Sequence, residues 1–371
     1  MFDNTTVTIT PEMAWLCIAL YSIGVIYTVL NYKKWPYDES TKKSCVYFFA
    51  FFWVFAVTYT IDADFFHYKE IVATTNEVLD YGLEQVYQHL ILWLHNDYMA
   101  FRIVVWGVAL FAYALTAKIL NIDVKVSLAL LFVIFGNVFS YARATLAFAV
   151  YFLGLSLSIE SKKKINNRIA MLVIGLALMG ASFFLHRSMI VLIALTPVGL
   201  IDMTKKKLYF TLVATPIIIY GIQYVLGDII ALAEMDDVIS RRLDLYNDYD
   251  SGQANWKGVI GSFTYYGTYA VSLFIVSRSL LNNLKHIFIP SSVMKFTTYV
   301  LALVYISMIM LIVMGGSDIY THRYIKMTIV PISLLMTYCY TKGLISNKEM
   351  AFILGLGIFS RYWALAKFMF L

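Results

Sequence analysis

Two short stretches of the chain carry side chains that could act on a phosphorylated substrate. Arg143 lies in FSYARATLAFA (139–149), and His186 and Arg187 lie in SFFLHRSM (182–189). Arginine binds phosphate and pyrophosphate through a planar fork of N–H donors, and a histidine can take a proton from a hydroxyl group near neutral pH. Simpler interpretations stay open: Arg143 could extend its charge from a helix end towards water, and His186 could be a hydrogen-bonded structural residue.

Carboxylates gather in a third stretch, TIDADFFHYKE (60–70). Asp62, Asp64 and His67 fall within six residues of one another, a composition that could ligate a metal ion or hold sugar hydroxyls. A solvated polar strip explains the same pattern equally well, and the DxD motif is short. We therefore expect no resident metal and no cofactor.

A long polar segment, 227–257, mixes seven acidic residues with further cations and aromatic hydroxyls. Its arginines and tyrosines of interest are Arg241, Arg242, Tyr246 and Tyr249. Later in the chain Arg323 stands beside His322 in SDIYTHRY (317–324). Each charge alone is typical of a solvated loop or a helix-end anchor, but together they resemble a clamp for an anionic, lipid-linked substrate.

The elements that position these residues follow from composition. The chain has 371 residues, of which 60% are hydrophobic and only 14% charged, whereas a soluble domain has about 25% charged residues. The mean hydropathy is +0.72. Because a membrane span needs about 20 apolar residues, the sequence predicts an all-α, polytopic integral membrane protein that forms one transmembrane domain over residues 1–371, with no separate soluble domain.

Apolar runs predict 11 or 12 spans. Their ranges are 13–30, 44–59, 99–120, 124–141, 145–159, 169–185, 189–201, 208–226, 259–277, 296–314, 325–340 and 350–370. The last run contains Arg361 and Lys367, so it could lie partly in the interface. The first run lacks a basic leader and a cleavage pattern, so we expect a retained span.

Basic residues predict the orientation of these spans. Lysine and arginine concentrate in cytoplasmic loops, and alternate loops hold 18 of them on one side and 11 on the other. The side with 18 basic residues is therefore expected to be cytoplasmic. This distribution explains the net charge of +6 better than nucleic-acid binding does. The outer side is poorer in lysine but richer in arginine. The outer arginines are Arg102, Arg143, Arg187, Arg241, Arg242, Arg323 and, if the last run crosses, Arg361.

Two outer segments are long enough to have structure of their own, 61–98 and 227–257. In the first, an amphipathic helix on the membrane surface is predicted. Its polar positions are Glu77, Asp80, Glu84 and Gln88, and its apolar positions are Leu79, Leu83, Val86, Leu90 and Trp93. No P-loop, GxGxxG, HExxH or GxSxG motif occurs in a usable context, which argues against ATP-driven transport, dinucleotide chemistry, zinc proteolysis and α/β-hydrolase chemistry.

The order of these motifs resembles the EpsG-like group of bacterial polysaccharide polymerases, relatives of the Wzy-type O-antigen polymerases. The stretches that carry the resemblance are an acidic outer helix with Glu77, Tyr81 and Gly82, an Arg-x-x-x-Ala motif from Arg143 to Ala147, a Phe-x-His-x-Ser pattern from Phe184 to Ser188, and the segment 240–249 followed later by Arg323-Tyr324. A departure is Arg187 after the histidine, which adds a cation.

The resemblance implies a membrane-embedded glycosyltransferase of the GT-C type in the bacterial cytoplasmic membrane, with its active site facing the periplasm. Its substrates would be oligosaccharides linked to undecaprenyl pyrophosphate, and a chain-length regulator protein would be a partner. The implied catalytic residues are His186, Arg143, Asp62 and Asp64. The implied substrate-binding residues are Arg241, Arg242, Arg323, Arg187, Tyr246, Tyr249 and Glu77.

Three other functions stay open. An O-antigen ligase would use the same donor with a lipid A–core acceptor. A flippase or exporter of lipid-linked sugar would place charge near the middle of the membrane, whereas the arginines here fall at outer helix ends. An assembly scaffold would leave the one-sided arginines without a role.

Overall fold

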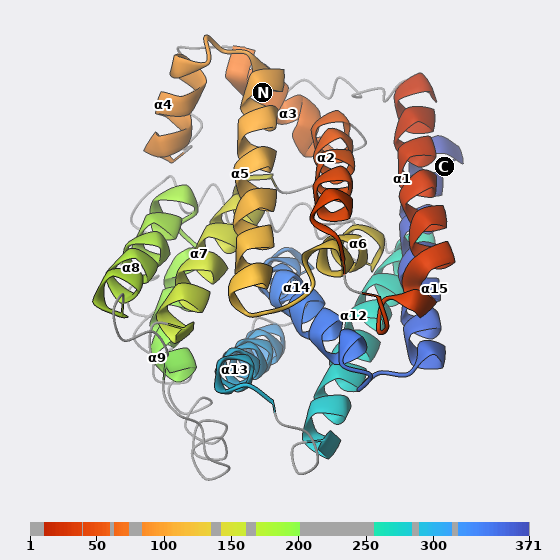
Figure 1. Ribbon diagram of the computed structural model, residues 1–371. Coiled ribbons are helices and arrows are strands. Elements are labelled where there is room, and N and C mark those ends of the chain that lie inside the picture. The colour runs from red at the N-terminus through yellow and green to blue at the C-terminus, as the bar shows by residue number, and fades with distance from the viewer. Residues whose placement is uncertain are drawn as a thin grey trace.

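The computed structural model describes residues 11–38, 40–59, 63–73, 84–134, 142–160, 168–200, 256–283, 289–313 and 318–370, and within these ranges every regular element is a helix. The helices are α1 (Pro11–Asn31), η1 (Tyr32–Lys34), α2 (Lys42–Thr58), α3 (Ala63–Ala73), α4 (Gln85–Trp93), α5 (Tyr98–Ile119), α6 (Val124–Ile134), α7 (Ala142–Glu160), α8 (Arg168–Leu185), α9 (Met189–Leu200), α12 (Trp256–Asn283), α13 (Ser291–Val313), α14 (Asp318–Thr341) and α15 (Asn347–Phe370). Figure 1 shows them packed side by side as a bundle.

Four stretches among the described residues are long and apolar enough to cross a membrane. They are Glu12–Lys34, which joins α1 to η1, and the helices α5, α7 and α8. The predicted all-α membrane protein is confirmed at this level. Shorter apolar helices cover parts of other predicted spans, and the predicted span 208–226 lies outside the described residues. The total of 11 or 12 spans therefore stays a prediction.

α7, whose second residue is Arg143, lies at the centre of the bundle. In its apolar stretch 72% of residues are buried, against 17% in α8 and 33% in the stretch from Glu12 to Lys34. α7 contacts α5, α8, α9, α13 and α14. The exposed sides of α1 and α8 are apolar, which is expected where a helix faces lipid.

Small residues let α7 and α8 approach closely. A Cβ added at Gly154 of α7 would lie 2.5 Å from the carbonyl oxygen of Gly175 in α8, and one added at Gly175 would lie 2.6 Å from the carbonyl oxygen of Gly154. Such backbone contact is the usual way in which membrane helices associate, since lipid supplies no hydrophobic drive between them. This crossing fixes the start of α7 relative to the turn between α8 and α9.

Local signals set several helix ends. The Asp97 carboxylate accepts from the backbone N–H groups of Met99 and Ala100 at 2.8 and 3.1 Å and caps α5. Asn121 and Gly343, at φ 56° and 69°, follow the last residues of α5 and α14 in left-handed conformations. Asn121 and Gly343 thus end α5 and α14 at the end of the bundle that holds the α1–α2 turn.

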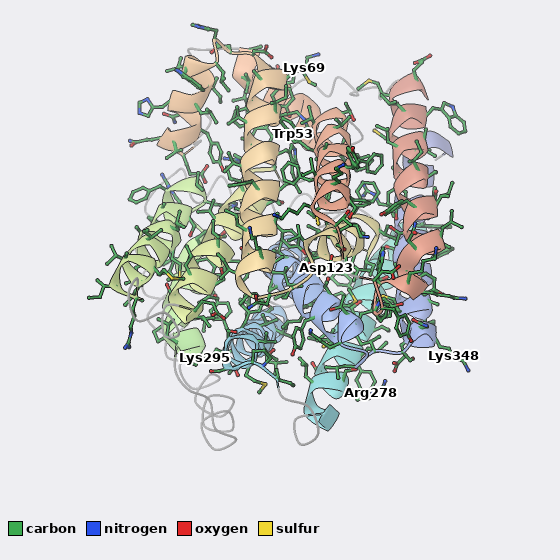
Figure 2. All side chains as sticks on the ribbon, viewed as in Figure 1. Trp53, Lys69, Asp123, Arg278, Lys295 and Lys348 are labelled. Carbon is green, nitrogen blue, oxygen red and sulfur yellow. The ribbon has the colours of Figure 1, made fainter. Side chains whose placement is uncertain are left out.

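Basic side chains lie at both ends of the bundle. Figure 2 places Lys69 at the end where α3 and α4 lie, and Arg278, Lys295 and Lys348 at the opposite end. We call the second one the lysine end, and the first the α4 end. The α1–α2 turn belongs to the lysine end, because the Tyr340 hydroxyl donates to the backbone oxygen of Tyr32 at 2.8 Å. The lysine end carries residues predicted to be cytoplasmic and the α4 end carries residues predicted to be outer, and the orientation in a membrane stays a prediction.

Candidate functional site

Arg143 is the centre of a cluster of polar and aromatic groups at the α4 end. Its Nη1 lies 2.8 Å from Oε2 of Glu84, with which it forms an ion pair. Its Nη2 donates to the hydroxyl of Tyr68. The guanidinium carbon also lies 4.7 Å from the ring centre of Tyr68 and 5.9 Å from that of Tyr87. Carboxylate and ring faces both favour a cation, so the guanidinium is held from several sides.

Three separate elements supply this cluster. Tyr68 comes from α3, Glu84 and Tyr87 come from the start of α4, and Arg143 is the second residue of α7. The Tyr87 hydroxyl donates to the backbone oxygen of Arg143 at 3.1 Å. Burial raises the pKa of Tyr87, against the opposing effect of the nearby Arg143 charge, so this hydroxyl is neutral and can donate. The α3 and α4 segments are thereby tied to the beginning of α7.

Arg143 retains hydrogen-bonding capacity after these contacts. A guanidinium carries five N–H donors, and Glu84 and Tyr68 are its only side-chain hydrogen-bond acceptors among the described residues. The Arg143 side chain is 23% exposed and that of Glu84 is 12% exposed. A cation that is positioned, partly open and not saturated can bind an incoming oxyanion without first being reorganised.

Arg102, also predicted to be an outer arginine, has a different role. It is 4% exposed, and its Nε and Nη2 donate to three backbone oxygens at the end of α2. These acceptors are Ala56 and Tyr59, at 2.7 Å each, and Val57 at 3.0 Å. The last carbonyls of a helix lack partners within the helix, so Arg102 caps α2. Arg361 is 5% exposed and lies 4.8 Å from the ring centre of Tyr59; it too is an interior residue.

His186 lies in the turn between α8 and α9, where its ring accepts locally. The backbone N–H of Ser188 donates to Nδ1 at 3.3 Å, and the Ser188 hydroxyl lies 3.0 Å from the same atom. A neutral imidazole that accepts at Nδ1 carries its proton on Nε2. This tautomer lets Nε2 donate a hydrogen bond, and the predicted role of His186, to take the acceptor proton or to orient the donor, stays a prediction. Arg187, beside it, is exposed.

The remaining predicted site residues are not tested by the geometry. Asp64 and Arg323 lie on α3 and α14, where only the backbone is described at these positions. Outside the described residues are Asp62, Glu77, Arg241, Arg242, Tyr246 and Tyr249. Among the side chains that are described, no group of three metal-binding residues comes together.

The chain matches none of the protein-family models, curated proteins or solved structures with which it was compared.

The helix predicted in 61–98 needs one correction. Glu84 does not lie on the polar face of a helix but precedes α4 at its N-cap position. The buried residues of α4 are Tyr87 and Ile91, while Val86 and Trp93 are 42% and 71% exposed. The protein thus packs mainly against Tyr87 and Ile91, with Leu90 of the predicted apolar face partly buried and Val86 and Trp93 exposed.

Tyr68 and Tyr87 are the site residues that sequence reasoning missed. Neither is close to Arg143 in the chain, and the separations are 75 and 56 residues. A tyrosine in a chain with 28 of them carries no local signal that it will face an arginine. The available clue was the placement of both in the acid-rich outer segment that precedes Arg143.

Proposed function

We propose that this protein is a lipid-linked repeat-unit polymerase. It transfers a growing glycan from undecaprenyl pyrophosphate to a hydroxyl of a second lipid-linked oligosaccharide, at the outer face of a bacterial cytoplasmic membrane. The observation that carries the proposal is Arg143. Glu84 and Tyr68 hold it at the α4 end, and its hydrogen bonds to described side chains leave further N–H donors of the guanidinium unused by those residues.

The chemistry needs little beyond positioning and charge. The bond between the anomeric carbon and the pyrophosphate oxygen breaks, the acceptor oxygen forms the new glycosidic bond, and the acceptor hydroxyl loses its proton. Pyrophosphate is already a good leaving group, so catalysis depends on orienting two glycans and stabilising the negative charge that develops on the departing oxygens. A guanidinium fork suits that second task.

The proposed roles divide among the site residues. Arg143 binds the departing pyrophosphate, with Arg241, Arg242 and Arg323 as further cations for the same group. His186 donates from Nε2 to the donor or the acceptor. Asp62 and Asp64 hold the acceptor sugar and receive its hydroxyl proton.

The neighbours of Arg143 support this assignment. Two tyrosine rings and a carboxylate surround the guanidinium, and rings and carboxylates are also common surfaces for sugar. An O-antigen ligase would use the same donor chemistry and differs only in its acceptor, so the test must separate the two.

A deletion and complementation experiment does so. Cells that lack the protein are expected to carry single repeats on lipid A–core and no long chains, and the wild-type gene restores the long-chain ladder. An Arg143→Ala variant should not restore it, whereas Arg168→Ala, an exposed arginine at the start of α8, should. Complete loss of attached glycan in the deletion strain would identify a ligase, and a normal ladder from well-expressed Arg143→Ala would contradict the assignment.

A further inference from the structure

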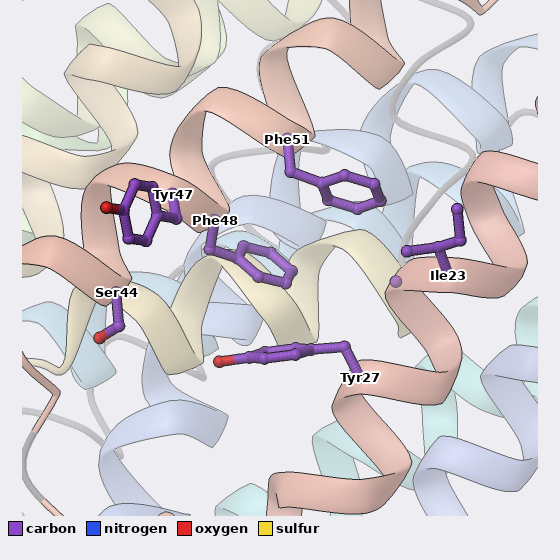
Figure 3. Close-up of a pocket in the computed structure, with 7 residues that line it drawn as sticks. Ile23, Tyr27, Ser44, Tyr47, Phe48 and Phe51 are labelled. Atoms are coloured by element: carbon purple, nitrogen blue, oxygen red, sulfur yellow. The ribbon is translucent and has the colours of Figure 1, made fainter.

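A groove between α1 and α2 lies outside the candidate site and at the other end of the bundle. It has a volume of about 370 Å³, in the range of about 300–1,000 Å³ typical of small-molecule sites. The side chains that form it are Ile23, Tyr27, Ser44, Tyr47, Phe48 and Phe51 (Figure 3). Its wall is predominantly apolar.

The groove is polar at one end and apolar at the other. α1 runs towards the lysine end and α2 runs away from it, so Tyr27 and Ser44 lie nearest the lysine end, and Ile23 and Phe51 lie deeper in the bundle. Figure 3 shows the Tyr27 hydroxyl on the same side of the groove as Ser44, with the rings of Phe48 and Phe51 beyond it. The Tyr27 and Phe48 ring centres are 5.5 Å apart. An amphiphile would fit this gradient in one orientation.

Four exposed lysines lie in the chain segments next to Tyr27 and Ser44, the residues of the polar end. Lys33 and Lys34 form the end of η1, and Lys42 and Lys43 begin α2, directly before Ser44. None of the four forms an ion pair with a described residue. The connecting turn also contains Asp38 and Glu39 in its sequence, so the net charge of the turn stays positive. A negatively charged headgroup is the complementary partner.

The groove opens on the side of α1 that faces away from the protein. Ile23, Ile26 and Leu30 on α1 are 55%, 57% and 70% exposed, and α1 is one of the helices able to cross a membrane. If α1 crosses a membrane, this exposed apolar face borders lipid. Lysines next to the surface of an anionic leaflet attract its lipids.

We infer that the α1–α2 groove binds an anionic phospholipid of the leaflet on the lysine side, with one acyl chain along Phe48, Phe51 and Ile23 and the headgroup on Lys42 and Lys43. The lipid is not the proposed glycan carrier, because the groove and Arg143 lie at opposite ends of the bundle. This inference does not depend on the proposed function.

Native mass spectrometry of the purified full-length protein in a neutral detergent tests the inference. Three probes are titrated: dioleoyl phosphatidylglycerol, dioleoyl phosphatidylcholine and sn-glycerol 3-phosphate. We expect retained adducts with phosphatidylglycerol, much weaker ones with phosphatidylcholine and none with glycerol 3-phosphate. Equal binding of the two lipids, or binding of glycerol 3-phosphate alone, would overturn the proposal.

Matched variants locate the site. Lys42→Gln with Lys43→Gln should weaken phosphatidylglycerol binding by at least about fivefold, since each lysine near an anionic surface is worth roughly that factor. Lys342→Gln with Lys348→Gln removes the same charge from exposed positions near α15 and should change it little. The first pair takes cations away from the start of a helix, where they are unfavourable, so α2 is not weakened. Equal effects of the two pairs would refute the site.

A second pair of variants tests the chain-binding part. Ile23→Trp should fill the apolar end of the groove and lower phosphatidylglycerol binding. Ile26→Trp adds the same bulk at a similarly exposed residue of α1 that does not line the groove, and should leave binding unchanged. Loss of binding in Ile26→Trp, or none in Ile23→Trp, would contradict the placement of the acyl chain.

Discussion

Arg143 and Glu84 are 59 residues apart in the chain, yet Nη1 of the first lies 2.8 Å from Oε2 of the second. The pair joins the start of α7 to the start of α4, at the end of the bundle opposite the lysine end. Glu84 also neutralises part of the Arg143 charge. A phosphate oxygen that binds Arg143 must therefore share the guanidinium with this carboxylate or displace it.

Glu84→Gln is expected to strengthen substrate binding. The amide oxygen can still accept from Arg143, but the competing negative charge is gone. One charge at this distance near a protein surface is worth about 1 kcal/mol or more, so the apparent KM for the lipid-linked donor should fall about fivefold. The free energy of unfolding should drop by about 1–3 kcal/mol, because the pair is mostly buried. Glu84→Ala is the comparison, because it also removes the hydrogen bond that positions Arg143. An unchanged KM in Glu84→Gln would show that Arg143 does not meet the anionic part of the substrate.

Arg102→Met should destabilise the protein without a specific effect on activity. Methionine keeps the apolar stem but leaves the carbonyls of Ala56, Val57 and Tyr59 without their donor. The loss of these charge-assisted bonds should lower the free energy of unfolding by about 3 kcal/mol, measurable by thermal denaturation in detergent. Activity per folded molecule should remain near the wild-type value. A selective loss of activity at wild-type stability would mean that Arg102 contacts substrate after all.

His186→Asn separates a structural from a chemical role of this histidine. An asparagine oxygen can accept from the Ser188 N–H, as in an ordinary Asx-turn, but no group replaces Nε2–H. The variant should melt at nearly the wild-type temperature and lose about 10²-fold or more in polymer formation. His186→Gln offers an amide near the former Nε2 position and should recover part of the activity. Wild-type activity in His186→Asn would show that His186 has only a structural role in the turn between α8 and α9.

Gly175→Ala should destabilise the protein by separating α7 from α8. Its new Cβ would lie 2.6 Å from the carbonyl oxygen of Gly154, so α8 must move away from α7, at a cost of about 1–3 kcal/mol. Gly180→Ala is the control on the same helix, because a Cβ there meets nothing within 4 Å, and it should be neutral or stabilise by at most about 1 kcal/mol. Thermal denaturation of both variants checks this, and equal melting temperatures would rule out the close crossing.

Sequence reasoning located helices well where an apolar run has clear ends. The predicted span 169–185 corresponds to Arg168–Leu185, and 189–201 corresponds to Met189–Leu200, because the short polar turn at His186 interrupts an otherwise continuous apolar run. It was less accurate for 61–98. There the periodicity of Val86, Leu90 and Trp93 selected one face of α4, whereas packing against α5 and α8 buries Tyr87 and Ile91.

The site was also predictable only in part, because its residues come together through tertiary packing. Arg143 was singled out because it is an arginine at the outer end of a predicted span. The same two criteria also selected Arg102, which is a buried helix cap. A single sequence does not distinguish these two because the difference lies in distant carbonyls. The partners Tyr68, Glu84 and Tyr87 depend on how α3 and α4 pack over the start of α7, which is tertiary information.

Polymer formation by the purified protein is the most direct test of the central claim. Full-length protein is incubated with undecaprenyl-pyrophosphate-linked repeat units in detergent or vesicles, without nucleotide and without a lipid A–core acceptor, and the products are separated by size. We expect a ladder of multiple repeats with released undecaprenyl pyrophosphate from the wild type and from Arg168→Ala, and none from Arg143→Ala at equal folded concentration. A wild-type protein that leaves the repeat units unjoined, or an Arg143→Ala variant that joins them normally, would contradict the account.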